Sequence, residues 1–359
     1  MMRNPPLLVS AFRNPQFCLA LTSEEWDLLI RQARAANVLA TLNTRLMGAQ
    51  LLDEVPAAPR RHLQNAARVA ERLQTNVRWE LHRICEALFH LAIPIVALKG
   101  AAYVIDNAAA APGRTFNDID ILVPKSSLDL VEHDLKLAGW VATHHNEYDQ
   151  RYYRQWMHEL PPLRHITRMT VIDVHHALLP ETARLRPDPN KVVADAVETS
   201  INPDLYVPSS IDQFLHSACH LFHEGEFSNG FRDLLDLDAL YRTIHASDPT
   251  HWATLCTRAE ELELTRPLYY ALSLCRRILQ TPLPGDCEAQ MANYALPAPF
   301  DAIMSTLFSH ALAPSHRSCD RFLTGPARWL LYVRSHYMRM PLRLLIPHLL
   351  RKAVRGEDE

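Results

Sequence analysis

The sequence predicts an α+β fold in which a small mixed β-sheet core is flanked by N-terminal and C-terminal helical regions. The strand-like apolar runs lie in the middle of the chain, at residues 93–98, 116–123 and 169–174. Residues before and after this middle segment show the three- and four-residue apolar spacing of helices. Only nine glycines occur among 359 residues, which favours helix as the dominant element. We therefore divide the chain into three regions, namely residues 1–90, 91–190 and 191–359.

The composition narrows the classes of function. A formal net charge of −3 gives no global basic field, so we expect no long nucleic acid as a partner. The seven cysteines include no Cys-x-x-Cys pair, which favours reduced thiols over a disulfide framework. The N-terminus leads into no long apolar segment, and no apolar run reaches about 18 residues. We therefore expect neither a signal peptide nor a membrane span, and a cytoplasmic location.

The N-terminal region reads as helices. Thr22 and Glu25 fit an N-terminal cap, and Pro56 and Pro59 interrupt the pattern before a long amphipathic stretch at Arg60–His90. The apolar positions of that stretch are Val69, Leu73, Val77, Leu81 and Ile84. Such a stripe predicts a helix that packs beside the sheet as a support element.

Three carboxylates interrupt the strand-like runs of the core. Asp118 and Asp120 are two residues apart, so a strand places both on one face. Two like charges so close raise each other's pKa, a conflict that a divalent cation relieves. Asp173 lies in the run at 169–174 and completes the set if the two strands are neighbours. Three carboxylates that converge on two Mg²⁺ ions suit in-line phosphoryl transfer.

A candidate phosphate-binding turn precedes these aspartates. The apolar run at residues 93–98 ends at Lys99-Gly100, and an alanine-rich stretch, Ala101–Ala111, favours helix. Free backbone N–H groups at a helix start attract anions, Gly100 allows close approach, and Lys99 offers a cation. Pro112-Gly113 then predicts the turn into the carboxylate strand.

This order of elements resembles the DNA polymerase beta-like nucleotidyltransferase superfamily, and within it a bacterial family of nucleotidyltransferases. The likeness covers roughly residues 20 to 245. The motifs that carry it are Leu98-Lys99-Gly100, Arg114, Asp118-Ile119-Asp120-Ile121-Leu122-Val123 and Ile172-Asp173-Val174-His175. One departure is that the superfamily usually has Gly-Ser at the helix start, whereas Ala101 follows Gly100 here.

The resemblance implies a metal-dependent transfer of a nucleoside monophosphate from a nucleoside triphosphate, with ATP as the expected donor, to a hydroxyl acceptor. The acceptor would be a small molecule, a sugar or a protein, and pyrophosphate would leave. Asp118, Asp120 and Asp173 would hold two Mg²⁺ ions, while Lys99 and the Gly100-Ala101 turn would bind the triphosphate. Because Ala101 supplies no hydroxyl, a catalytically inactive nucleotide sensor or scaffold is the alternative.

Three further residues have two interpretations each. Arg114 contacts the triphosphate or is a surface arginine. His175 shares a face with Asp173 and lies near the acceptor or a phosphate, or is a hydrogen-bonded histidine in the shell around the site. Arg232 reaches the nucleotide or forms a structural ion pair with Asp236.

The remaining features permit no single assignment. Residues 144–168, rich in polar and aromatic side chains, form an acceptor-facing hairpin or an edge region. His216, His220 and His223 share one helical face, which permits zinc-dependent hydrolysis, although packing near the site is the simpler explanation. The basic, aromatic segment from residue 327 onward forms a packed amphipathic helix or lies on an anionic membrane surface. Residues 356–359 are expected to be disordered.

Overall fold

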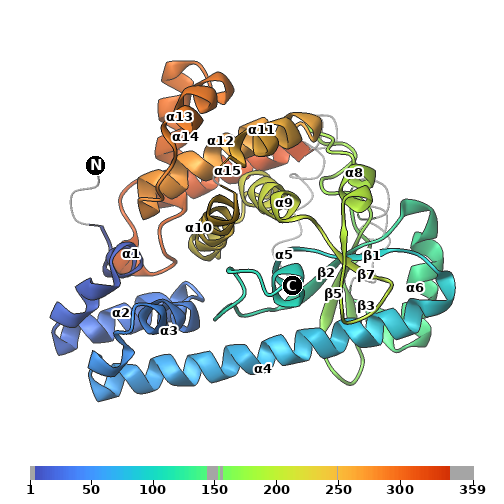
Figure 1. The fold of residues 1–359 in the computed structure, drawn as a ribbon, viewed down its shortest axis with the longest axis horizontal. Coiled ribbons are helices and arrows are strands. Elements are labelled where there is room, and N and C mark those ends of the chain that lie inside the picture. The colour runs from blue at the N-terminus through green and yellow to red at the C-terminus, as the bar shows by residue number, and fades with distance from the viewer. Residues whose placement is uncertain (1–4, 144–152, 154–156, 249, 340–359) are drawn as a thin grey trace, which may run out of the picture.

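The computed structural model of the protein describes residues 5–143, 153, 157–248 and 250–339. Helices dominate and surround one mixed β-sheet (Figure 1), which confirms the predicted α+β class. None of the helices in these residues is both long enough and apolar enough to cross a membrane.

The helices fall before, within and after the sheet-forming segment. Those that precede the first strand are α1 (Leu7–Arg13), α2 (Ser23–Ala35), α3 (Leu39–Gly48) and α4 (Ala57–Leu88). Those interleaved with strands are α5 (Lys99–Ile105), α6 (Leu128–Leu137) and α8 (Pro189–Ala194). Those that follow are α9 (Ser210–His223), α10 (Gly230–Ser247), α11 (Trp252–Glu261), α12 (Thr265–Leu274), α13 (Gly285–Met291), α14 (Ala298–Ala311) and α15 (Thr324–Arg339).

The sheet has seven strands in the order β3-β4-β5-β2-β1-β7-β6. They are β1 (Ile95–Ala97), β2 (Asp118–Leu122), β3 (Trp140–Ala142), β4 (Leu163–His165), β5 (Val171–His175), β6 (Val197–Glu198) and β7 (Leu205–Val207). β2 and β5 are parallel neighbours at the centre, although about fifty residues separate them in the chain. This pairing brings the two carboxylate-bearing strands together.

The long helix α4 connects the N-terminal helices with the sheet. It runs along one side of the molecule, from α2 and α3 to α5 and α6 (Figure 1). Val77, Leu81 and Ile84 are buried, as the apolar stripe predicts. Val69 was expected in the same stripe but its side chain is 58 % exposed, because the middle of α4 spans between the two packed ends.

Local signals mark several element ends correctly. Thr22 and Glu25 form a complete capping box at the start of α2. Gly113 has a φ of +78°, and a side chain there would meet the backbone of Ala40, so the predicted turn requires glycine. The helix expected over Ala101–Ala111 is shorter, since Asn107 adopts a φ of +52° and the chain leaves the helix after Ile105.

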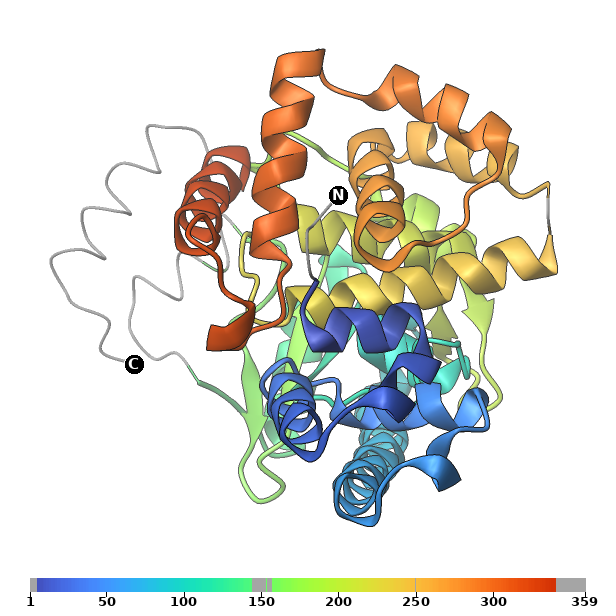
Figure 2. The same ribbon diagram turned by 90° about the vertical axis from the view of Figure 1, so that its left-hand side faces the viewer.

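The N-terminal and C-terminal helices pack against each other. The Phe12 ring on α1 meets the Phe231 ring on α10 edge-on, with centroids 5.9 Å apart, and Figure 2 shows these two helices side by side. Buried apolar residues from Leu8 to Leu331 belong to one hydrophobic core. The division into three regions stays a prediction, while the packing shows that the predicted regions share their interior.

Candidate active site

The parallel register of β2 and β5 brings the predicted aspartates together. Asp120 pairs directly with Asp173, and Asp118 lies one pleat earlier on β2. All three line a single polar cavity of about 300 Å³. Ile119 and Ile121 are buried on the opposite face, as the period of two requires. The three carboxylates therefore face one space.

Among the three aspartates, Asp120 is the one whose carboxylate is held by hydrogen bonds from Lys99 and His175. Its Oδ1 accepts hydrogen bonds from Lys99 Nζ and His175 Nε2, each at 2.9 Å. Burial alone would raise the pKa of Asp120, but the Lys99 charge and the His175 hydrogen bond hold that pKa well below its usual value. Asp120 is therefore an anion in a largely buried setting.

The pKa values of Asp173 and Asp118 are shifted in the opposite direction to that of Asp120. Burial, followed by the nearby Asp120 charge, raises the pKa of Asp173 to about 8 and also raises the pKa of Asp118. Asp173 Oδ1 is buried and has no hydrogen-bond partner in the described part of the chain. An unpartnered carboxylate oxygen beside a second carboxylate is a fitting ligand for a hard divalent cation. The residues present thus fit the Mg²⁺ site that the sequence predicts.

The turn before the aspartates holds Lys99 in a strained backbone conformation. Lys99 has a φ of +47°, an uncommon value for a residue with a side chain, and its Nζ reaches Asp120 from there. A Cβ on Gly100 would lie 2.7 Å from Arg114 Nη1 and 2.7 Å from the Phe116 ring. Glycine at position 100 therefore makes room for these two side chains beside the cavity. Ala101 is buried in α5 and also lines the cavity.

Arg114 forms a buried ion pair. Its Nε donates to Asp236 Oδ2 at 2.8 Å, and Asp233 lies 3.8 Å from Nη2. The residue is only 9 % exposed, so the interpretation as a surface arginine is wrong. The predicted pairing of Arg232 with Asp236 is also wrong, because Asp236 faces Arg114. Arg232 instead donates to its neighbour Asp233 at 3.0 Å and lines the cavity.

Comparison with known proteins places the chain in a family. The sequence pattern of a family described as "Uncharacterised nucleotidyltransferase" matches residues 22–280, a range that contains the three aspartates, Lys99, Gly100 and Arg114. The chain belongs to this nucleotidyltransferase family. Neither the curated proteins nor the solved structures contain a match to the chain.

The cavity has acidic residues that the sequence did not single out. Glu159, Glu224 and Glu226 all line it. Glu159 lies within the segment at 144–168, of which residues 144–152 and 154–156 are outside the described residues, and it forms an isolated bridge with His175. No periodic pattern or motif surrounds Glu159, so only the long-range contact with β5 reveals it. A signal for Glu224 was available, since it follows the histidines of α9 at four-residue spacing.

The three histidines of α9 do not gather around a common point. His223 Nδ1 donates to the Cys219 carbonyl at 3.2 Å, while His220 pairs with Glu224 at 2.8 Å. Within the described residues, the His, Cys, Asp and Glu side chains whose ligand atoms do gather are His158, Glu159 and His175. Packing near the active site therefore remains the better interpretation of His216, His220 and His223.

His223 is expected to make the fold sensitive to acid. Burial lowers the pKa of His223 to about 4, so its neutral form stabilises the fold above pH ~6.5, and this stability is lost as the pH falls toward 4. Between pH 7 and 4.5 the loss amounts to about 2 kcal/mol of unfolding free energy. Denaturant titrations of the wild type and His223→Leu at several pH values measure it. The wild type should lose this amount relative to the variant, and a difference independent of pH would contradict the assignment.

The C-terminal segment is described only in part. Arg334 donates to the Phe222 carbonyl and Arg339 donates to the His223 carbonyl, so α15 packs on α9. This contact favours the packed amphipathic helix over a membrane-surface helix for residues up to 339. The basic residues Arg343, Arg351 and Lys352, and the end predicted to be disordered, lie outside the described residues.

Proposed function

We propose that the protein transfers a nucleoside monophosphate from a nucleoside triphosphate to a hydroxyl group of a small molecule, sugar or protein, with release of pyrophosphate. The observation that carries this proposal is the register of β2 and β5, which sets Asp120 beside Asp173 in the cavity that Asp118 also lines. The Asp-x-Asp strand and the later single aspartate also support a relation to the DNA polymerase beta-like superfamily. All seven cysteines are buried and none forms a disulfide within the described residues, which supports a reducing cytoplasm as the compartment.

The three aspartates, Lys99 and Arg232 have roles in this reaction that their environment in the cavity supports. Asp118, Asp120 and Asp173 would hold two Mg²⁺ ions, which neutralise charge on the phosphates and activate the attacking hydroxyl. Lys99 and Arg232 line the cavity and supply positive charge for the triphosphate, with ATP as the expected donor. Asp173, whose Oδ1 has no hydrogen-bond partner among the described residues, would orient the acceptor hydroxyl and receive its proton. The hydroxyl oxygen forms a bond to the α-phosphorus as the bond to the β-phosphate oxygen breaks.

In this arrangement Arg114 positions other residues of the cavity and does not bind the nucleotide directly. Its guanidinium is committed to Asp236 and lies over the rings of Tyr103 and Phe116, at 5.5 Å from each centroid. Arg114 also lines the cavity, so it contributes positive potential there. We assign it a positioning role beside Gly100, since a fixed guanidinium shapes the wall that the triphosphate would contact.

The alternative is a nucleotide sensor or scaffold without catalysis. Two observations favour it: Ala101 offers no hydroxyl to a phosphate, and Asp120 Oδ1 is already engaged by Lys99 and His175. The second Asp120 oxygen and the carboxylates of Asp118 and Asp173 still leave ligands for cations. Turnover separates the two functions, since both would bind a nucleotide.

The test is pyrophosphate release from labelled ATP, GTP, CTP and UTP in a lysate of the source organism, with and without Mg²⁺. We expect one or more nucleotides to label an acceptor, with equimolar pyrophosphate, only when Mg²⁺ is present. The labelled acceptor is then identified by mass. Saturable nucleotide binding without pyrophosphate release under any of these conditions would establish the sensor instead.

A further inference from the structure

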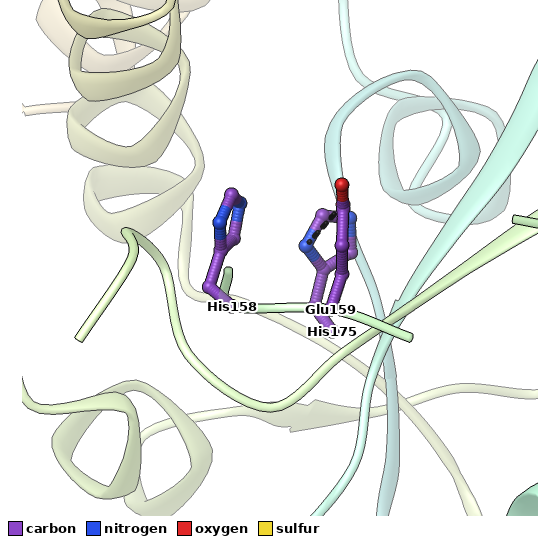
Figure 3. Close-up of side chains that lie close together, drawn as sticks. All are labelled: His158, Glu159 and His175. Carbon is purple, nitrogen blue, oxygen red and sulfur yellow. Dashed lines mark ion pairs between the residues drawn. The ribbon is translucent and has the colours of Figure 1, made fainter. Parts of the chain in front are cut away.

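A second group of metal-ligand side chains lies beside the aspartates. His158, Glu159 and His175 each offer one ligand atom, and these atoms all lie within 4.8 Å of one another. Figure 3 shows the three side chains together, with Glu159 over His175 and the His158 ring facing them. The His175 Nδ1 atom is 3.4 Å from Glu159 Oε2, and the two imidazole centroids are 5.1 Å apart. The group combines two nitrogen ligands with one oxygen ligand.

The backbone holds this group in place. His176 N donates to the His158 carbonyl at 2.8 Å, and Leu160 N donates to the Val174 carbonyl at 2.9 Å. These bonds fix residues 158–160 antiparallel to β5, with Glu159 bridged to His175. A site of residues from two segments is therefore already assembled before any ligand binds.

His175 has the environment of a metal-binding histidine. Its Nε2 lies 2.9 Å from Asp120 Oδ1. With the proton on Nε2, the carboxylate accepts this hydrogen bond and Nδ1 presents its lone pair to the side of Glu159 and His158. Histidines that bind metals commonly donate their other ring N–H to a carboxylate in this way.

His158 provides an independent indication. It is 7 % exposed, and its Nδ1 is buried without a hydrogen-bond partner in the described residues. A buried imidazole nitrogen without a partner costs free energy, which a ligand at this place would recover. The neighbouring Glu159 is on the wall of the cavity, so an ion can enter from there.

We propose that His158, Glu159 and His175 bind one divalent transition-metal ion of the Zn²⁺ class, separate from the Mg²⁺ ions of the three aspartates. Two imidazoles and one carboxylate suit Zn²⁺ or Co²⁺, whereas Mg²⁺ prefers oxygen ligands alone. Ligand atoms of a tetrahedral Zn²⁺ lie about 3.4 Å apart, so the side chains need to close by about 1 Å. Glu159 lines the cavity and His175 donates to Asp120, so the three residues would hold the ion beside the aspartates.

The test uses the full-length protein, freed of metal by a chelator and titrated with Co²⁺ in excess Mg²⁺. We expect one equivalent of Co²⁺ to bind with the visible absorption of a low-coordinate ion. His158→Ala and Glu159→Gln are expected to lower the affinity on the order of 100-fold, and Asp120→Asn by roughly 10-fold through His175. The matched control His176→Gln, at a neighbouring buried histidine outside the group, should bind like the wild type.

The outcomes separate this site from the proposed nucleotidyl transfer. Asp118→Asn is expected to bind Co²⁺ normally while it loses transfer, because Asp118 is not part of the group. No Co²⁺ absorption in the wild type would overturn the proposal, as would wild-type affinity in both His158→Ala and Glu159→Gln. If His158→Ala does not fold, Glu159→Gln alone decides. A loss of binding in His216→Gln with an unchanged Glu159→Gln would move the ion to α9.

Discussion

Asp173→Asn is expected to abolish nucleotidyl transfer and, in the metal-free protein, to raise the free energy of unfolding. Asparagine removes the charged oxygen that would hold a cation and receive the proton, so turnover should fall on the order of 10³-fold or more. The stability gain follows from the pKa of about 8, to which burial raises Asp173. A raised carboxyl pKa makes the ionised form costly in the fold, so the wild type loses stability as the pH rises from ~4 to ~8.

Both effects are measured on one preparation. Pyrophosphate release reports turnover, and denaturant titration at pH 8 with chelator should show a gain on the order of 2 kcal/mol that shrinks toward pH 4. Asp129→Asn, an exposed carboxylate on α6, is the matched control and should change neither quantity. Turnover retained in Asp173→Asn would remove Asp173 from the catalytic set, whereas lower stability at pH 8 would contradict the buried-charge argument alone.

Arg114→Met is expected to destabilise the protein by about 3–5 kcal/mol. The substitution leaves Asp236 buried and without its counter-ion, and an uncompensated buried charge is among the most costly single changes. Arg114→Met combined with Asp236→Leu should recover most of the loss, because an apolar pair of similar volume needs no counter-ion. Denaturant titrations of the wild type, both single variants and the double variant form the cycle that measures the coupling.

Arg232→Met is the matched control for this cycle. Arg232 also lines the cavity and is ion-paired, but its partner Asp233 is its chain neighbour. Without Arg232, Asp233 keeps contact with solvent and with Arg114. We expect a loss of about 1 kcal/mol together with weaker nucleotide binding. If Arg114→Met were no more destabilising than Arg232→Met, the Arg114–Asp236 pair would not be structural and a direct contact of Arg114 with the nucleotide would become the better interpretation.

Local sequence determines those features of the fold and the site that depend on residues close together in the chain. Asp118 and Asp120 share a face because strand side chains alternate. Position 113 requires glycine because its φ is positive and a side chain there would meet the backbone of Ala40. Thr22 and Glu25 lie three residues apart and cap α2 without help from the rest of the chain. Each of these predictions depends on only a few neighbouring residues.

Long-range packing decided the contacts of the site that join distant segments of the chain. The register that sets Asp173 beside Asp120, the bridge that brings Glu159 to His175, and the choice of Asp236 over Asp233 as the main partner of Arg114 all join distant segments. Their sequence patterns are compatible with several pairings, since alternation fixes which face a side chain occupies but not which strand lies next to it. The sequence alone thus indicated the three aspartates and the glycine turn as candidates for the chemistry, but it did not single out Glu159. The tertiary structure decided which of them meet, because only burial of the shared core selects one arrangement of strands and helices.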